Sequence, residues 1–131
     1  MQSGIIYRIY SQSLNKCYIG STFKDVNKRL KKHEGNYKDY LRWMEMEEMT
    51  RPKYIKILSS YEVLKNNDYK IEVIDKIITN DRKKLETLEY LYIHIYSHEN
   101  IVNRKKKMIK FKNLDDDDIK ERMKKHYIIK F

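Results

Sequence analysis

The sequence predicts a small domain of the α/β class and α+β type, in which helices flank a three-stranded antiparallel sheet. The expected order is β-β-α-α-β-α, followed by a basic helical extension. Three observations predict it: two β-rich apolar runs near the N-terminus, an alternating run in the middle, and helical apolar spacing elsewhere. The chain has 131 residues, 40% of them hydrophobic, which suits one domain with a real core. We expect residues 1–103 to form the domain and residues 104–131 the extension.

The strands are expected where β-forming residues alternate or cluster. Residues 4–10 and 17–21 are apolar and β-rich, and the polar string SQSLNK joins them. The tightest turn dipeptide, Asn-Gly, is absent from this string, so we expect a loop of more than two residues. The third strand is expected after the polar turn at residues 66–68. Its alternation predicts that Tyr69 and Asp75 share one face.

Each helix is predicted from a starting residue and an apolar stripe. Asp25 is a suitable N-cap for a helix that begins at Val26 and that residues 37–49 continue or restart. Pro52 is expected to begin a second helix, and Asp81 to cap a third. The stripe of the second helix is Tyr54, Ile57, Leu58 and Tyr61. The stripe of the third is Leu85, Leu88, Leu91, Tyr92 and Ile95.

The string WMEMEEM at residues 43–49 permits two interpretations. We expect it to pack onto the core through its methionines and tryptophan, which is the commoner use of such residues. A stripe that binds a protein partner is the alternative.

The charge of the chain predicts a polyanionic partner. The net charge is +10, and the isoelectric point is about 9.5. This favours nucleic acid over a membrane as partner, with a merely solubilising basic surface as the alternative. The single cysteine excludes an internal disulfide and a cysteine-rich zinc site. No apolar run resembles a signal peptide or a membrane span, so we expect an intracellular protein, cytoplasmic or nuclear, in a reducing compartment.

Five side chains have the chemistry that phosphodiester hydrolysis requires: Tyr7, Tyr18, Arg29, His33 and Glu89. The spacing of four places Arg29 and His33 on one helix face. Arginine matches phosphate oxygens, and histidine exchanges a proton near neutral pH. Glu89 adjoins the apolar stripe of its helix, so burial should create a need for a cation beside it.

These residues form a set that resembles the GIY-YIG nuclease family. Ile5-Ile6-Tyr7 stands where Gly-Ile-Tyr is expected, with Ile5 in place of the glycine and Gly4 one residue earlier. Residues 18–20, Tyr-Ile-Gly, match the second motif in full. Arg29 and His33 match the R-x-x-x-H of the first helix. The string ETLEYLYI at residues 86–93 resembles the glutamate helix of the family, and Asn103 resembles its terminal asparagine.

The resemblance implies a metal-dependent DNA endonuclease that uses Mg²⁺ or Mn²⁺ and no small-molecule cofactor. It implies that Tyr7 acts on the water as general base or positioning partner, relayed with His33, and that Tyr18 bonds the water or the phosphate region. It further implies that Arg29 binds phosphate oxygens and Glu89 the metal, while Asn103 orders the hydrogen bonds of the site. A catalytically silent nucleic-acid-binding module with the same fold is the alternative.

Each residue also has a simpler explanation when taken alone. The tyrosines would be ordinary strand aromatics, and Arg29 part of a solvated basic face with Lys28 and Lys32. Glu86 competes with Glu89 as metal ligand because it lies three residues earlier on a similar face. His94 and His98 have the spacing of a metal-binding pair, but surface histidines are the expected reading.

DNA contacts are expected from two groups of cations. Lys28 and Lys32 flank Arg29 on the first helix, and the extension begins with a basic run. That run is Arg104, Lys105, Lys106 and Lys107. No zinc module or helix-turn-helix is evident, so sequence specificity should be modest. We expect a monomer, or a dimer that forms transiently on DNA.

Overall fold

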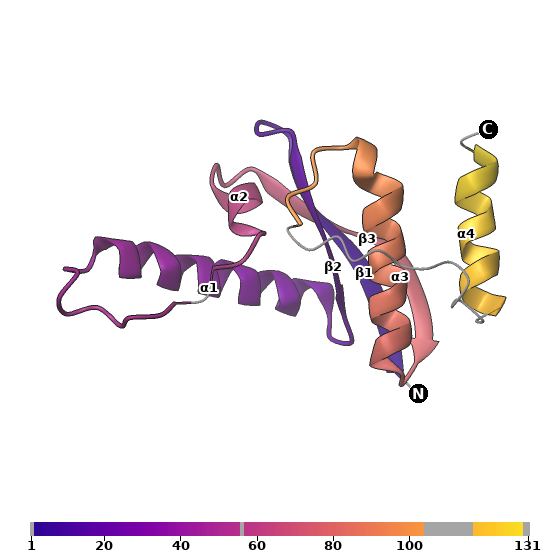
Figure 1. Cartoon of the computed structure of the whole chain (residues 1–131), viewed down its shortest axis with the longest axis horizontal. Helices are drawn as coiled ribbons and strands as arrows, with labels where there is room; N and C mark the ends of the chain where they lie inside the picture. The colour runs from indigo at the N-terminus through magenta and orange to yellow at the C-terminus, as the bar shows by residue number, and fades with distance from the viewer. Residues whose placement is uncertain (1, 56, 104–116, 130–131) are drawn as a thin grey trace.

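The computed structural model describes residues 2–55, 57–103 and 117–129, and it has the expected α+β architecture with a three-stranded antiparallel sheet (Figure 1). The element order β-β-α-α-β-α is confirmed, and a 3-10 turn and a last helix follow it. The strands are β1 (Gln2–Ser11), β2 (Lys16–Thr22) and β3 (Tyr69–Thr79). The helices are α1 (Val26–Glu45), α2 (Tyr61–Leu64), α3 (Arg82–Ile95), η1 (Tyr96–His98) and α4 (Asp117–Ile129).

The sheet has the order β2-β1-β3, so the two strands of the N-terminal hairpin form its centre and one edge. Residues 12–15 make the turn, in which Asn15 adopts a positive φ of 50°. Asparagine tolerates this left-handed conformation better than most residues. The expectation of a loop longer than two residues is confirmed.

A β-bulge in β3 corrects the expected alternation of this strand. Ile6 pairs with Asp75, but the next residue, Tyr7, pairs with Val73, so Ile74 is an extra residue. The insertion shifts the phase of the side chains. Tyr69 therefore packs on one face of the sheet while Asp75 contacts helices on the other. The prediction that they share a face was wrong because sequence alternation does not reveal a bulge.

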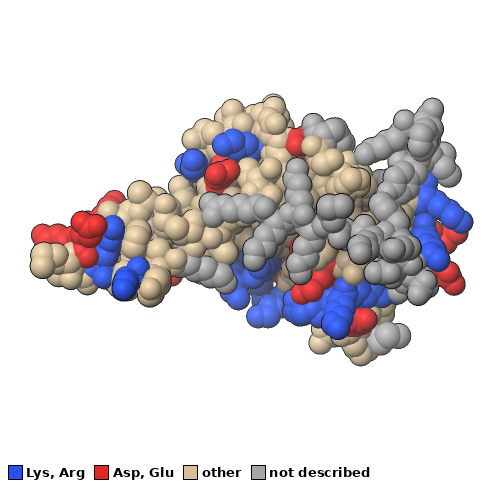
Figure 2. All heavy atoms as spheres, viewed as in Figure 1, with Lys and Arg blue, Asp and Glu red and all other residues tan. Residues whose placement is uncertain are grey.

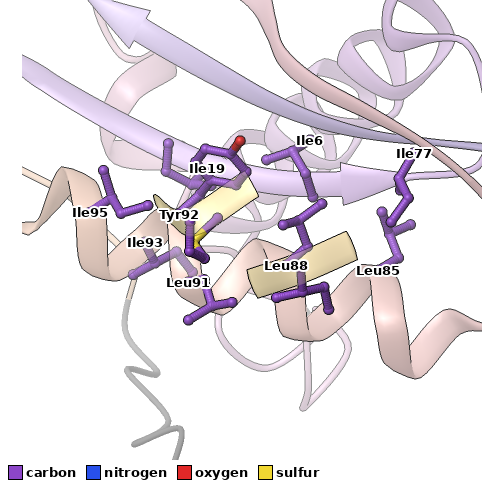
Figure 3. Close-up of a cluster of buried hydrophobic side chains, with 11 residues drawn as sticks. Ile6, Ile19, Ile77, Leu85, Leu88, Leu91, Tyr92, Ile93 and Ile95 are labelled. Atoms are coloured by element: carbon purple, nitrogen blue, oxygen red, sulfur yellow. The ribbon is translucent and has the colours of Figure 1, made fainter. Parts of the chain in front are cut away.

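The sheet separates two apolar clusters. On one face Tyr7, Ile9 and α2 form a smaller cluster, against which the start of α1 packs. On the other face Ile6, Ile19 and Ile77 meet the stripe of α3, as Figure 3 shows. The stripe expected for α3 is buried as predicted. β1 therefore places Tyr7 and Ile6 in different environments although they are adjacent in sequence.

The N-caps of the two long helices are those expected. The Asp25 carboxylate accepts hydrogen bonds from the backbone N–H groups of Asn27 and Lys28, at 2.9 and 3.3 Å. Asp81 accepts one from Lys83 at 3.0 Å. Both caps satisfy backbone donors that have no partner within the helix.

The helix expected from Pro52 is absent. Residues 51–55 and 57–58 form no helix, and among the described residues between α1 and β3 only Tyr61–Leu64 are helical. Two residues of the predicted stripe are exposed, Tyr54 by 83% and Ile57 by 49%. Helical spacing alone did not establish a helix here, because half of the stripe has no surface to pack against.

α1 extends well beyond the sheet, which corrects the expected packing of residues 43–49 (Figure 1). The helix continues from Val26 but ends at Glu45, so Met49 lies outside it. Met44 is 55% exposed and Met49 98% exposed, so these methionines do not join the core. Trp43 instead packs locally: its indole N–H donates to the Pro52 carbonyl at 2.7 Å, and the Arg51 guanidinium covers its ring.

The C-terminal helix α4 lies beside α3, next to β3 (Figure 1). Ile119 and Met123 are buried in the same cluster as the α3 stripe. The Arg122 guanidinium pairs with Asp75 of β3 at 2.6 Å. The helical part of the extension thus contributes to the core. The basic run 104–107 lies outside the described residues. None of the helices that the structure describes combines the length and the apolar character of a membrane-spanning segment.

Candidate active site

Tyr7, His33 and Arg29 meet on the α1 face of the sheet. The Tyr7 hydroxyl lies 2.8 Å from His33 Nε2, and Arg29 Nε–H donates to the same phenol oxygen at 3.3 Å. Tyr7 comes from the middle of β1, and the helical spacing of four directs both α1 side chains toward it. His33 is 2% exposed, so its imidazole lies inside the fold rather than on the surface.

Gly20 of β2 makes room for the Tyr7 ring. The two residues are partners in the β1–β2 register, and a Cβ atom at Gly20 would lie 2.4 Å from the Tyr7 hydroxyl oxygen. Any side chain at this position would displace the phenol. The position of the Tyr7 ring, from the first motif, therefore explains why the second motif has a glycine at residue 20.

Tyr18 completes the aromatic side of the cluster. Its ring centroid lies 6.3 Å from that of Tyr7 and 5.3 Å from that of His33, both in tilted or edge-on arrangements. Burial raises the pKa of Tyr18, and the neighbouring Tyr7 and Glu89 raise it further. Burial also raises the pKa of Tyr7, although the Arg29 charge opposes this shift. Both phenols are therefore protonated at neutral pH.

Glu89 of α3 lies close enough to the cluster to affect both phenols. Burial raises the pKa of its carboxyl group, Glu86 adds to this shift, and a hydrogen bond from Ser21 with the charges of Arg29 and Arg82 opposes it. The negative charge of Glu89 in turn raises the pKa values of Tyr7 and Tyr18. Glu89 is thus the α3 carboxylate that faces the phenols, which favours it over Glu86 as the residue of interest.

A basic groove of about 480 Å³ opens beside this cluster. Arg29 belongs to both, since it lines the groove and bonds Tyr7. Figure 2 shows Lys and Arg side chains gathered where the starts of α1 and α3 approach each other. The groove is lined by Ser21, Thr22, Phe23, Lys24, Lys28, Arg29, Lys32 and Arg82, a set with five cations and no carboxylate. Such a surface suits a chain of phosphates.

Asn103 does not reach the phenols but holds the strand that carries Tyr18. Its side-chain oxygen accepts from the Ile19 N–H at 3.0 Å, and its amide donates to the Ile19 carbonyl at 2.8 Å. The preceding residues pair with the same edge, where Cys17 bonds Asn100 and Val102 through the backbone. Asn103 therefore continues, with its side chain, a short backbone pairing along β2.

Several residues of the site were not found from the sequence. Ser60 is fully buried, and its hydroxyl lies 2.8 Å from His33 Nδ1. Ser21 bonds Glu89, and Lys24 and Arg82 join the groove. Only Ser21 carried a sequence signal, because it directly follows the Tyr-Ile-Gly motif.

The other residues considered from the sequence lie outside this constellation. His94 is exposed on α3. Among the residues that the structure describes, no three His, Cys, Asp or Glu side chains cluster as metal ligands. A second hollow, of about 570 Å³, is lined by Arg8, which already pairs with Glu72 and Glu99 at 2.6 and 2.9 Å.

Comparison with known families agrees with this geometry. A model of the GIY-YIG catalytic domain matches residues 3–110, most of the chain. The chain belongs to the GIY-YIG family. Comparisons with curated proteins and with solved structures give no match.

Membership of the GIY-YIG family assigns a nuclease-type activity to the chain. The first family motif is altered here, because Ile5 replaces its glycine. The β1–β2 pairing nevertheless runs without interruption from Ile5 opposite Thr22 to Ser11 opposite Lys16. The substitution therefore leaves the ladder between the two motif strands regular, and the bulge falls on the other side of β1.

Proposed function

We propose that this protein is a metal-dependent DNA endonuclease that hydrolyses phosphodiester bonds. One observation carries the proposal: Arg29 bonds the Tyr7 hydroxyl and also lines the basic groove. A phosphate held in the groove by this guanidinium would lie next to the phenol and imidazole pair. Proximity of this kind turns a reaction between separate molecules into one within a single complex.

The raised pKa of Tyr7 indicates how the water is activated. A phenol that stays protonated at neutral pH cannot accept a proton unless it loses its own. His33 Nε2, 2.8 Å away, is positioned to receive it. We therefore propose that Tyr7 takes the proton of the attacking water while its own proton moves to His33. The water oxygen forms the new bond to phosphorus, and the bond to the leaving oxygen breaks.

Arg29 and the groove cations would stabilise the charge on the phosphate. The guanidinium presents donors that match two non-bridging oxygens, and it adds positive charge beside the phosphate. Preorganised cations in a partly desolvated site favour the transition state, in which negative charge on the phosphate is greatest. Lys28 and Lys32 extend the same surface and would bind neighbouring phosphates.

The surroundings of Glu89 fit a divalent cation such as Mg²⁺ or Mn²⁺. Burial raises the pKa of this carboxyl group, so its ionised form is short of stabilising partners in the protein alone. One carboxylate with Ser21 beside it resembles the sparse sites in which Mg²⁺ keeps most of its waters. A bound cation would supply Lewis-acid stabilisation of the oxygen that leaves.

The decisive test is the nicking of supercoiled plasmid with Mg²⁺ or Mn²⁺. We expect nicking by the wild type, and losses of at least about 100-fold in Arg29→Ala and Glu89→Gln. Arg42→Ala is the matched control for the first, because Arg42 lies on the same helix, is exposed and is remote from the groove. Glu86→Gln is the control for the second, and it should nick far better than Glu89→Gln.

Nicking at the wild-type level in both active-site variants would refute the proposal. DNA binding that weakens with salt but never leads to cleavage would instead support the silent binding module.

A further inference from the structure

We infer that Ser60 is a positioning residue that holds His33 in the tautomer able to accept a proton from Tyr7. This inference rests on the proposed nuclease function. The serine belongs to neither motif strand nor to α1 or α3. Its hydroxyl lies 2.8 Å from His33 Nδ1, the ring nitrogen opposite the one that meets Tyr7.

The imidazole is held at both ends in a site closed to solvent. Ser60 is fully buried and His33 is 2% exposed. The ring also lies edge-on to two phenols, with centroid distances of 5.3 Å to Tyr18 and 6.0 Å to Tyr7. Water does not reach Ser60 in this arrangement, so it cannot readily replace the serine hydroxyl as the partner of Nδ1.

The partners of Tyr7 favour one tautomer. Arg29 Nε–H can only donate, so the phenol oxygen accepts this bond. The phenol proton is then free to point at His33 Nε2, which must be unprotonated to accept it. In neutral imidazole the proton then resides on Nδ1, and Nδ1–H donates to Ser60 Oγ. Serine thus completes a chain in which each donor meets an acceptor.

A hydroxyl suits this role better than a carboxylate or a backbone carbonyl would. When the Tyr7 proton reaches His33, the imidazolium carries a proton on both nitrogens, and Nδ1–H still donates to Ser60. When the proton leaves again through either nitrogen, the hydroxyl can rotate and donate instead. The contact is therefore maintained in each protonation state without a second charge in the buried site.

The backbone around Ser60 indicates why its side chain is available. Ser60 precedes α2 at the N-cap position, where a serine hydroxyl usually bonds the helix N–H groups. Here the hydroxyl makes no such bond, and only the Ser60 carbonyl serves the helix, accepting from Val63 at 2.9 Å. Tyr61, the next residue, packs against Tyr37 and Tyr40 of α1 and thereby fixes the serine relative to His33.

The first test compares Ser60→Ala with Ser60→Thr and with Ser59→Ala, the neighbouring serine that serves as control. We expect Ser60→Ala to lower kcat for plasmid nicking by about 10- to 100-fold with KM unchanged, a loss typical of residues that orient a catalytic histidine. Ser60→Thr keeps the hydroxyl and should recover most of the rate, and Ser59→Ala should match the wild type. Equal rates in Ser60→Ala and the wild type would overturn the inference.

The second test measures the tautomer directly and needs neither DNA nor metal. In ¹⁵N-histidine-labelled protein, the His33 signals are assigned from their absence in His33→Gln. We expect long-range ¹H–¹⁵N spectra to report the Nδ1–H form in the wild type and a shift toward Nε2–H or an averaged ring in Ser60→Ala. An unchanged spectrum, or an Nε2–H form in the wild type, would contradict the inference even if threonine at position 60 prevents folding. A wild type that never nicks DNA would refute the proposed function instead, so the two failures are distinguishable.

Discussion

At the scale of single residues, Tyr7 connects the parts of the site. Its hydroxyl meets His33 and Arg29, its ring covers Gly20, and the Glu89 charge affects its pKa. A substitution at any of these neighbouring residues can move the Tyr7 side chain. We therefore expect that such a substitution can remove activity even though Tyr7 itself is unchanged.

Gly20→Ala is expected to abolish most nicking by moving Tyr7. The added methyl group would lie 2.4 Å from the phenol oxygen, so the ring must shift away from His33. Overpacking of this kind also costs about 1–3 kcal/mol of stability. Urea denaturation and plasmid nicking measure the two effects.

Gly35→Ala is the matched control for this change. Gly35 lies inside α1, and nothing stands within 4 Å of the added methyl group. Alanine is favoured over glycine in a helix, so a gain of about 0.5–1 kcal/mol with unchanged nicking is expected. Wild-type nicking by Gly20→Ala would show that the position of Tyr7 is not critical.

Glu89→Gln is expected to remove activity and yet raise stability in the absence of divalent cations. Because burial raises the pKa of Glu89, the fold favours the protonated acid over the carboxylate. The wild type therefore loses stability relative to the glutamine variant as pH rises from the ordinary glutamate range through the raised pKa. Urea denaturation in EDTA at a series of pH values measures this difference.

Addition of Mg²⁺ should reverse the order of stability. A cation that binds only the folded wild type stabilises it by mass action, and the variant lacks the carboxylate. If Mg²⁺ raised the melting temperature of both proteins equally, its binding would not depend on Glu89.

At the scale of secondary structure, the Asn103 side chain completes the hydrogen bonding along the outer edge of β2. Asn103→Ala removes both hydrogen bonds to Ile19, which lies between Tyr18 and Gly20. At about 0.5–1.5 kcal/mol for each bond, the expected loss of stability is about 1–3 kcal/mol. Amide exchange at Ile19 should become faster, and nicking should fall because Tyr18 and Gly20 share this strand.

Asn103→Asp distinguishes the contributions of the two hydrogen bonds between Asn103 and Ile19. Aspartate keeps an acceptor for the Ile19 N–H but places a carboxylate oxygen against the Ile19 carbonyl. We expect slow exchange at Ile19 to survive in part, with stability lower than in the wild type. If amide exchange became equally faster at all residues of β2 in the Asn103 variants, with no larger effect at Ile19, Asn103 would not act through its hydrogen bonds to Ile19.

The sequence predicted the clustered residues of the candidate site better than it predicted the packing of the elements around them. Tyr7, Arg29 and His33 were predicted as one set because their motifs resemble those of one family, and the helical spacing of four also placed Arg29 and His33 on one face. Ser60 was not, since it lies 27 residues from His33 in a segment whose apolar spacing resembled a helix. The extension of α1 beyond the sheet was also missed, because the apolar residues of the segment 37–49 do not show where the sheet ends.

At the scale of the whole molecule, α4 packs beside α3 and also contacts β3. Ile119 is 2% exposed in the main cluster, and Arg122 reaches across to Asp75, which also accepts from the Tyr92 hydroxyl. The first part of α4 is therefore fixed against α3 and β3 through Ile119, Arg122 and Met123.

Ile119→Ala tests this anchoring. Loss of a buried isoleucine side chain is expected to cost about 2–4 kcal/mol, whereas Lys120→Ala, at an exposed position of the same helix, should change stability by no more than about 0.5 kcal/mol. Thermal and urea unfolding measure both. Equal stabilities for the two variants would mean that α4 does not pack on the domain in solution.

The pairing of residues 100–103 along β2 also bears on solubility. An uncovered edge strand offers a row of backbone groups to which another chain can add its own strand. Here residues 100–103 cover the edge of β2. They follow α3 and η1 in the chain, so the edge is covered only after these helices have returned the chain to the hairpin. Until that last segment docks, one side of the sheet stays open to neighbouring molecules. We therefore expect that the asparagine that closes this edge reduces self-association of newly made protein.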